Sequence, residues 1–143
     1  MADAQSMVEA FHRMFDIVAN RAPTVVDEPT RALRERLIQE EFEELKEAMA
    51  RNDLAAIAKE MADLLYVVYG TAVSYGIAID PVFREVHRSN MSKVGGYKRD
   101  DGKWVKPPGY SPAEVGPILA EQRIREGLVV DSQPGFHDLP RRR

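Results

Sequence analysis

Apolar side chains recur at intervals of three and four residues through the first half of the chain, the spacing that places them on one face of an α-helix. Three helices are therefore expected, over residues 4–19, from about Thr30 to about Arg51, and from Asn52 or Asp53 to about Tyr75. Gly76 is expected to end the third helix, because glycine adopts the left-handed backbone conformation without steric cost. This helix is apolar nearly all round, which indicates a central, buried position.

A fourth helix is predicted to begin at Asp80-Pro81, where an acidic capping residue precedes a proline in the first turn. It should run to about Val94 and end at Gly95-Gly96. The residues that follow are basic and rich in turn formers, so an ordered loop over the helices is expected. Trp104 and Tyr110 are expected to pack this loop.

Ser111 and Glu114 have the spacing of a capping box, which predicts a short last helix to about Glu126. No stretch alternates between apolar and polar residues as a half-buried strand does. We therefore predict an all-α fold, with a four-helix core, a short C-terminal helix and a tail. One domain is expected over residues 1–127, with its acidic core at 31–94 and its basic loop at 95–111, followed by a mobile tail at 128–143.

Composition narrows the class of protein. The 143 residues are 44% hydrophobic and 30% charged, as in soluble globular proteins. The absence of cysteine excludes disulfides, thiolate metal sites and cysteine nucleophiles. No apolar run approaches the roughly 20 residues that span a bilayer, and the first residues are polar, unlike a signal peptide. A cytoplasmic protein without a membrane partner is expected.

Charge is distributed unevenly along the chain. Residues 1–80 carry 8 basic and 15 acidic side chains, whereas residues 81–111 carry 7 basic and 3 acidic ones. A nucleic-acid backbone requires a continuous positive face, so no nucleic-acid partner is expected. The pattern suits a site that holds cations at one end and phosphates at the other.

The second expected helix contains four glutamates in the segment EEFEEL, residues 40–45. At about 100° per residue, Glu41 falls within the apolar stripe that should face the core. Glu40 and Glu44 lie on the border of this stripe, while Glu43 points outward. A merely solvated acidic face would avoid the apolar stripe, so the helical phase favours a functional role for the inward glutamates.

The third expected helix places Glu60 and Asp63 one turn apart among aliphatic residues. Burying ionised carboxylates without partners is prohibitive, so such groups are normally paired or bound to metal. Arg34 is the one base of these two helices on the apolar side, and it cannot balance four or five acids. Like charges about 4 Å apart repel by roughly 4 kcal/mol at an effective dielectric constant near 20, so the cluster needs cations. An all-oxygen ligand set predicts Mg²⁺, with Mn²⁺ able to replace it.

The acidic pattern EExxE, followed on the next helix by ExxD, resembles that of the MazG-like all-α nucleoside triphosphate pyrophosphohydrolases. The likeness covers residues 31–112 and extends to single-domain members described as phosphoribosyl-ATP pyrophosphohydrolase-like or dUTPase-like. The segments that carry it are RLIQEEFEEL, KEMADLLYVVYGTA, VFREVHRSNMSKVGG and DGKWVKPPGYSP.

This resemblance implies Mg²⁺-dependent hydrolysis of a nucleoside triphosphate substrate between its α and β phosphates, giving a monophosphate and pyrophosphate. It also implies a homodimer or homotetramer. The closer likeness to the dUTPase-like members favours deoxynucleotides, dUTP among them, and a role in nucleotide pool cleaning. By the same resemblance the metal ligands are Glu41, Glu44, Glu60 and Asp63. Glu40 binds metal or orients the attacking water, so Glu40 and Glu41 are the candidate catalytic residues, and which of them acts as a base stays open.

The fourth expected helix supplies candidates for the phosphate side of the site. Asn90 and Lys93 fall on the same face as Phe83 and Val86, which is expected to point inward. An asparagine and a lysine one turn apart suit a sugar hydroxyl or base edge and a phosphate. Lys106, in the basic loop, is the third candidate for substrate binding.

Three alternatives remain beside this interpretation. A carboxylate-bridged di-iron bundle requires Glu-x-x-His pairs on two helices, and the three histidines do not supply two such pairs. A true phosphoribosyl-ATP pyrophosphohydrolase would act on a bulky, modified purine triphosphate. A non-catalytic helical module would use the acids to hold a structural ion. Pyrophosphate release from triphosphates, with and without magnesium, separates the module from the enzymes.

Overall fold

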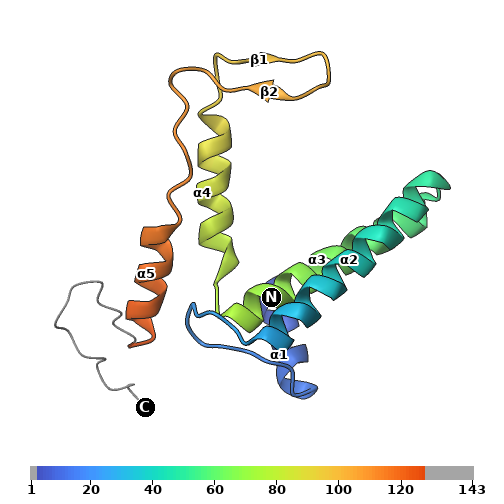
Figure 1. Cartoon of the computed structure of the whole chain (residues 1–143), viewed down its shortest axis with the longest axis vertical. Helices are drawn as coiled ribbons and strands as arrows, with labels where there is room; N and C mark the ends of the chain where they lie inside the picture. Colours follow the sequence, from blue (N-terminus) through green and yellow to red (C-terminus); the bar gives the residue numbers. More distant parts are fainter. Residues whose placement is uncertain (1–2, 128–143) are drawn as a thin grey trace. The chain divides into compact units, whose positions relative to one another are not determined.

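The structure, a computed structural model, describes residues 3–127 and confirms the all-α prediction (Figure 1). In chain order the elements are α1 (Ala4–Met14), α2 (Glu28–Ala50), α3 (Leu54–Tyr75), α4 (Ile79–Met91), β1 (Tyr97–Lys98), β2 (Trp104–Val105) and α5 (Gly116–Arg125). The tail predicted for residues 128–143 lies outside the described residues.

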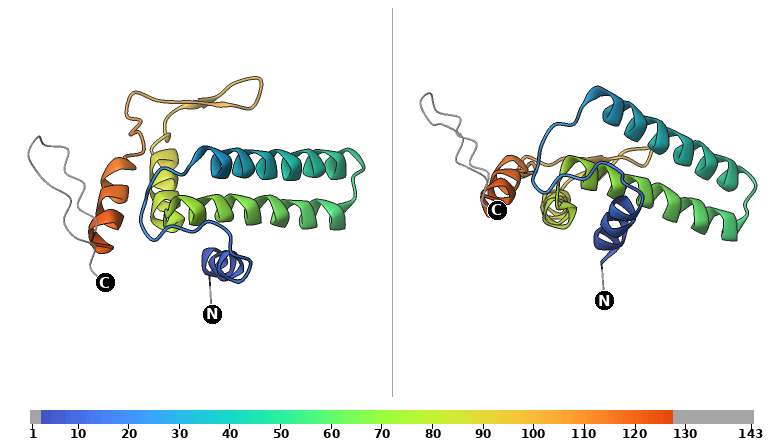
Figure 2. Two further views of the ribbon diagram at one scale, coloured as in Figure 1. Left: turned by 60° about the horizontal axis from the view of Figure 1, so that its bottom comes forward. Right: turned by 90° about the horizontal axis from the view of Figure 1, so that it is seen from below.

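The described chain divides into two compact units, and the boundary along the sequence lies between Ala78 and Ile79. The first unit holds α1, α2 and α3. Within it, α2 and α3 run antiparallel and side by side, and α1 packs on the other side of α3 (Figure 2). Asn52 makes the turn between α2 and α3 with a φ of 52°, a conformation that asparagine tolerates better than most residues. The second unit holds α4, the β1–β2 hairpin and α5.

Aspartate side chains begin the three helices of the first unit. Asp3, Asp27 and Asp53 each accept a hydrogen bond from a backbone N–H three residues later, at 2.8, 2.9 and 3.1 Å. These bonds satisfy N–H groups that have no partner within the helix. Asp53 and Gly76, which has a φ of 70°, confirm the predicted limits of α3. The predicted cap of α2 at Thr30 is wrong, because Thr30 donates to the true cap, Asp27.

Helix α1 is shorter than predicted. It ends at Met14 rather than at residue 19, because Asp16 adopts a φ of 54° and turns the chain. The returning chain then contacts the helix it has left, and the buried His12 Nδ1 lies 3.0 Å from the carbonyl oxygen of Val18. A positive φ at a residue other than glycine leaves little trace in the sequence, which is why apolar spacing alone predicted a longer helix.

The connector between α1 and α2 crosses the C-terminal end of α3. Two of its backbone N–H groups donate to the last carbonyls of α3, Asn20 to Val73 at 3.1 Å and Thr24 to Tyr75 at 2.9 Å. These carbonyls would otherwise lack partners, as at any helix end. The crossing is close at Gly76, where an added Cβ would collide with the backbone carbonyl of Ala22. The connector therefore depends on the absence of a side chain at Gly76.

Arg34 is buried between α2 and α3, with 5% of its surface exposed. Its Nη2 donates to the carbonyl oxygen of Val67 at 2.9 Å, and its Nε donates to Thr71 Oγ1 at 3.2 Å. Gly70 leaves room for the guanidinium, because an added Cβ would collide with Arg34 Nη2. Both hydrogen-bond partners are neutral, so this arginine does not neutralise the acids, in agreement with the sequence-based expectation.

Several apolar residues expected in the core are exposed. On α3, Met61, Leu65 and Val68 are between 42% and 57% exposed, which corrects the prediction that this helix is buried all round. Phe42 and Met49 of α2 are also exposed, although they lie on its apolar stripe.

Across residues 3–127 no single helix is both long and apolar enough to cross a membrane, whereas α3 and α4 taken as a bent pair meet these limits by length and composition alone.

The second unit contains a short hairpin that the sequence did not predict. Strands β1 and β2 pair antiparallel, with Tyr97 opposite Val105 and Lys98 opposite Trp104. Strands of two residues are too short to leave an alternating pattern. Helix α4 ends at Met91 rather than near Val94, and the turn over residues 92–96 connects it to the hairpin.

The segment after the hairpin is fastened to α4. The Ser111 N–H donates to Ser92 Oγ at 2.8 Å, and Arg88 Nη1 donates to Ser111 Oγ at 3.0 Å. The Glu114 N–H donates to Glu85 Oε1 at 3.0 Å. Because these tertiary bonds engage the serine and the glutamate, the predicted capping box is wrong, and α5 starts after this segment rather than within it.

Candidate functional site

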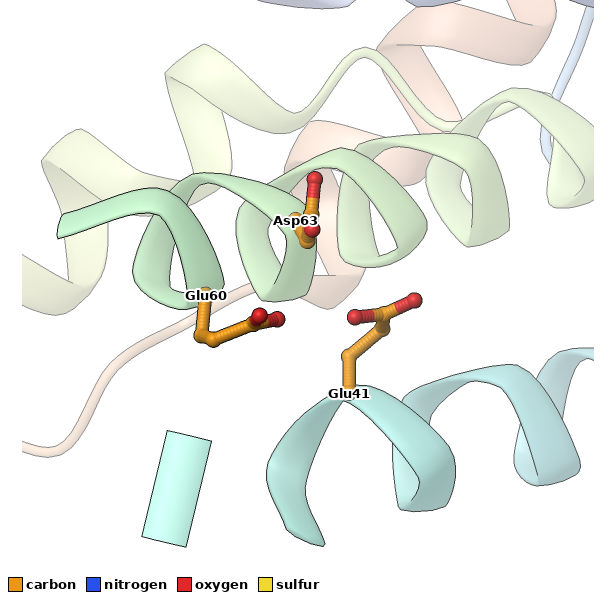
Figure 3. Close-up of side chains that lie close together, drawn as sticks. All are labelled: Glu41, Glu60 and Asp63. Atoms are coloured by element: carbon orange, nitrogen blue, oxygen red, sulfur yellow. The ribbon is translucent and has the colours of Figure 1, made fainter. Parts of the chain in front are cut away.

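Three acidic side chains meet between α2 and α3. Glu41 comes from the middle of α2, and Glu60 and Asp63 stand one turn apart on α3, facing it (Figure 3). One carboxylate oxygen from each residue lies within 4.8 Å of the other two. All three side chains are half-buried. The structure therefore brings together three of the predicted metal ligands, as the helical phase indicated.

Two oxygens of this carboxylate group have no hydrogen-bond partner. They are Glu41 Oε2 and Glu60 Oε2, and both are buried. Burial raises the pKa of Glu41, and the nearby charges of Glu44 and Asp63 raise it further. Leaving a buried polar atom unsatisfied costs about 1–3 kcal/mol, and more when the atom is charged. The group is therefore unfavourable as it stands, and a cation would stabilise it.

The donor set fits a divalent metal ion. Its oxygens come from two helices that pack side by side, so the backbone holds them in place before any ion arrives. Carboxylates are the ligands of hard cations, which complete their coordination with water or with phosphate oxygens of a substrate. The arrangement can therefore bring a metal ion and a phosphate together.

The remaining glutamates of EEFEEL take different positions. Glu44 is exposed rather than inward, although it lies close enough to hydrogen-bond the Glu41 carboxyl. Glu40 is exposed and lies outside the group formed by the three clustered carboxylates. Glu43 accepts a hydrogen bond from Gln39 at 2.8 Å and pairs with Lys46 at 3.4 Å, which confirms its predicted outward position.

Lys59 is a site residue that the sequence reasoning missed. Its Nζ lies 2.6 Å from Asp63 Oδ2 and 3.5 Å from Glu60 Oε1, although its side chain is largely exposed. The signal that could have found it is the four-residue spacing between Lys59 and Asp63, which makes them neighbours on a helix. The ammonium group neutralises two of the three carboxylates that would bind a metal ion, so Lys59 is expected to oppose metal binding.

Replacing Lys59 with glutamine is expected to tighten Mg²⁺ binding about fivefold. Two unit charges about 4 Å apart in a well-solvated setting interact by roughly 1 kcal/mol. Mg²⁺ carries two charges, but salt screens the exposed lysine, so the variant removes a net repulsion of about this size. Isothermal titration of the purified protein with Mg²⁺ measures the change. Lys46→Gln is the matched control, because Lys46 pairs with the outward Glu43. Equal Mg²⁺ affinity in the Lys59 variant and the wild type would contradict this expectation.

A basic cluster forms in the second unit around the ring of Tyr110. Lys106 Nζ lies 4.6 Å from the ring centroid, and Lys93 Nζ lies 6.0 Å from it. Lys93 Nζ also donates to Asn90 Oδ1 at 2.9 Å. The structure therefore brings the three predicted substrate-binding residues together, although Asn90 belongs to α4 and Lys106 to the loop. Two neighbouring ammonium groups create a local positive potential that attracts anions.

The basic cluster does not lie on an inward face of α4, as the sequence predicted. The expected inward face of α4 is not found, because Phe83 is 71% exposed and Asn90 is exposed as well. Instead the indole Nε1 of Trp104 donates to the Lys93 carbonyl at 2.7 Å, and Ser89 Oγ donates to the Tyr110 phenol oxygen at 3.2 Å. The two aromatic residues pack the loop, as predicted.

The hydrogen bonds that Glu85 forms with Arg88 and with the Glu114 N–H should make the stability of the protein depend on pH. The hydrogen bond from Arg88, with that from the Glu114 N–H, lowers the pKa of Glu85 from 4.5 to about 2. A carboxylate with a depressed pKa in the folded state stabilises it above the unfolded pKa and loses that effect as the pH falls. The stability difference between wild type and Glu85→Gln is expected to be constant above pH 4.5 and to vanish towards pH 2. Urea unfolding at several pH values measures it, and a difference that persists unchanged to pH 2 would contradict the assignment.

Comparison with known proteins assigns the chain to a family. A family model described as phosphoribosyl-ATP pyrophosphohydrolase matches residues 8–90, more than half of the chain. The matched range contains the carboxylate group and ends before Lys93 and Lys106. Among curated proteins none matches the chain. Because the match and the acids of α2 and α3 agree, the chain belongs to the phosphoribosyl-ATP pyrophosphohydrolase family, within the MazG-like all-α pyrophosphohydrolases, and hydrolyses a pyrophosphate bond in a nucleotide.

Proposed function

We propose that the protein hydrolyses a deoxynucleoside triphosphate, dUTP among the candidates, to the monophosphate and pyrophosphate, with Mg²⁺ held by Glu41, Glu60 and Asp63. The observation that carries this proposal is the pair of buried carboxylate oxygens without partners in a chain of this family. Glu44 would be a fourth ligand in this proposal, because its carboxylate lies close enough to hydrogen-bond the Glu41 carboxyl. Mn²⁺ has the same preference for oxygen ligands and can replace Mg²⁺.

The chemistry divides between the metal and the side chains. When bound, divalent ions supply charge neutralisation on the phosphate oxygens and lower the pKa of a coordinated water. The carboxylates of Glu41, Glu60 and Asp63 would hold the ion. Glu40 precedes Glu41 on α2 and is exposed to solvent, and it is the proposed residue to orient the attacking water, with Glu41 as the alternative. Asn90, Lys93 and Lys106 are proposed to bind the sugar and the phosphates.

A second candidate substrate is phosphoribosyl-ATP itself, which the description of the matching family favours. The same carboxylates and the same bond cleavage would serve this bulkier purine triphosphate. The choice between the two lies in the groups that contact the base. A panel that includes both substrates therefore decides it.

The test is a pyrophosphate-release assay over the canonical nucleoside and deoxynucleoside triphosphates, dUTP and phosphoribosyl-ATP. Release is expected from deoxynucleotides in the presence of Mg²⁺ and not after chelation. Selective release from phosphoribosyl-ATP would replace the first candidate with the second. The absence of turnover over the whole panel would favour a non-catalytic metal-binding module.

We also propose that the protein assembles as a homodimer or homotetramer. The support is the exposed apolar surface of the α2–α3 hairpin, which includes Phe42, Met49, Met61, Leu65 and Val68. Met61, Leu65 and Val68 recur at intervals of four and three residues and so share one face of α3, and an exposed apolar face usually marks an interface. Light scattering coupled to gel filtration measures the mass, and replacing Leu65 with lysine is expected to shift the mass towards the monomer. A monomeric wild type at micromolar concentration would contradict the proposal.

A further inference from the structure

The phenol of Tyr110 has an unusual setting for a residue that only packs a loop. Its ring is half-buried, and the ammonium groups of Lys106 and Lys93 lie 4.6 and 6.0 Å from the ring centroid. Within the part of the chain that the structure describes, neither Lys93 nor Lys106 forms an ion pair with a carboxylate. Two ammonium groups gathered around one ring without a paired carboxylate create a positive potential, so the cluster gains from an anion.

The hydroxyl of Tyr110 is oriented by a buried partner. Ser89, with 3% of its surface exposed, donates its hydroxyl proton to the phenol oxygen at 3.2 Å. The phenol oxygen thus accepts from α4, and its own proton remains to be donated elsewhere. This hydrogen bond, with the charges of Lys106 and Lys93, lowers the pKa of Tyr110 against the opposing effect of burial. A more acidic phenol is a stronger hydrogen-bond donor.

The lysines retain donors as well. An ammonium group has three N–H donors, and Lys93 uses one of them on Asn90 Oδ1. Lys106 lies over the ring, which attracts its charge without consuming the donors that point away from the ring. The cluster therefore presents several donors and two positive charges at one place in the second unit. That is the chemistry of a phosphate-binding site, because phosphate oxygens accept several charge-assisted hydrogen bonds at once.

We propose that Tyr110 is a substrate-binding residue, which donates its phenol proton to a phosphate oxygen of the nucleotide and, through its ring, positions Lys93 and Lys106 on the same phosphates. Ser89 acts through Tyr110 and is a positioning residue. This inference rests on the proposed function for the identity of the anion as a nucleotide phosphate. It does not require the carboxylate group, since every contact that supports it lies within the second unit.

The experiment measures binding of inorganic pyrophosphate to the full-length protein by isothermal titration, with EDTA present to exclude metal. Tyr110→Phe keeps the ring and removes the hydroxyl, and a hydrogen bond to a charged group is worth about a tenfold change in affinity. We therefore expect about tenfold weaker pyrophosphate binding and an increase in KM for the triphosphate, with kcat little changed. Tyr97→Phe is the matched control, because Tyr97 is 64% exposed on β1 of the same loop.

Ser89→Ala separates binding from packing. It leaves the phenol in place but removes the bond that orients it, so the expected loss of pyrophosphate affinity is smaller than in Tyr110→Phe. If the tyrosine served only to pack the loop, both variants would lower the unfolding temperature and leave pyrophosphate affinity unchanged. Affinity within twofold of wild type in Tyr110→Phe, or no binding of pyrophosphate to the wild type at millimolar concentration, would overturn the inference.

The carboxylate variant Glu41→Gln distinguishes this inference from the proposed function. It is expected to lose turnover and to keep the pyrophosphate affinity of the wild type in EDTA. If no triphosphate is hydrolysed by the wild type, yet pyrophosphate binds and Tyr110→Phe weakens it, the proposed function fails and the anion site stands. If triphosphates are hydrolysed with an unchanged KM in Tyr110→Phe, the function stands and the role of Tyr110 fails.

Discussion

Replacing Glu41 with glutamine, or Asp63 with asparagine, is expected to abolish pyrophosphate release while the helices remain formed. Each change keeps the size of the side chain and removes the charge that would bind the ion. Loss of a residue that merely supports a metal ligand typically lowers affinity or activity about 10–100-fold, so loss of a ligand should lower kcat/KM by at least about 100-fold. The pyrophosphate-release assay with saturating Mg²⁺ measures this loss.

Stability separates a loss of function from a loss of folding in these two variants. Glu41 is half-buried beside like charges that raise its pKa, so the glutamine relieves repulsion in the metal-free protein. The metal-free unfolding temperature of Glu41→Gln should therefore equal or exceed that of the wild type. Added Mg²⁺ should raise the unfolding temperature of the wild type and leave that of the variant nearly unchanged.

Glu43→Gln is the matched control for the same chemical change on the same helix. Glu43 contacts Gln39 and Lys46 on the outer side of α2, away from the carboxylate group. Its replacement is expected to leave both turnover and the effect of Mg²⁺ on stability within about twofold of wild type. Near-normal turnover in Glu41→Gln, or an equal loss in Glu43→Gln, would refute the assignment of the site.

Helical phase was sufficient to place the centre of this site. Glu41, Glu60 and Asp63 lie on long helices with clear limits, and a residue's direction on such a helix follows from its number. Glu44 lies on the border of the apolar stripe, where a small change in the angle between helices decides exposure. The structure leaves it exposed. Border positions are therefore where phase alone stops being predictive.

Contacts between distant segments account for most of what the sequence did not predict. Ser111 has a capping-box partner in Glu114, but Ser111 bonds to Arg88 and Glu114 bonds to Glu85, two residues of α4 that precede them by more than twenty positions. The Tyr110 phenol meets Ser89 and Lys93 across a similar separation. No local pattern encodes such pairings, because they depend on how the loop folds back. Lys59 is different, since its spacing from Asp63 was visible in the sequence and only its effect was overlooked.

The exposed apolar residues of α3 show that hydrophobic periodicity does not predict how much of a helix face is buried. The apolar pattern on α3 predicts burial of Met61 and Leu65, but it does not say which part of the structure covers them. Within one chain they remain exposed. Apolar spacing therefore identifies the face of a helix, but the amount of that face that is buried depends on what packs against it.

Replacing Gly76 with alanine is expected to destabilise the protein by about 3 kcal/mol. A left-handed backbone costs a residue with a side chain about 1–2 kcal/mol, and Gly76 has a φ of 70°. Forcing a methyl group into a packed site costs about another 1–3 kcal/mol. Here the obstacle is the backbone of Ala22, which cannot rotate away as a side chain could. Urea unfolding followed by far-UV circular dichroism measures the change.

Two other glycines separate the contributions to this loss. Gly95 also has a positive φ, of 90°, but an added Cβ would meet nothing within 4 Å, so Gly95→Ala reports the backbone term alone. Gly109 has neither a positive φ nor a neighbour within 4 Å, and Gly109→Ala should be nearly neutral. The expected order of destabilisation is Gly76, then Gly95, then Gly109. Equal losses at Gly76 and Gly95 would show that the connector does not press on the end of α3, because only the collision with Ala22 distinguishes the two sites.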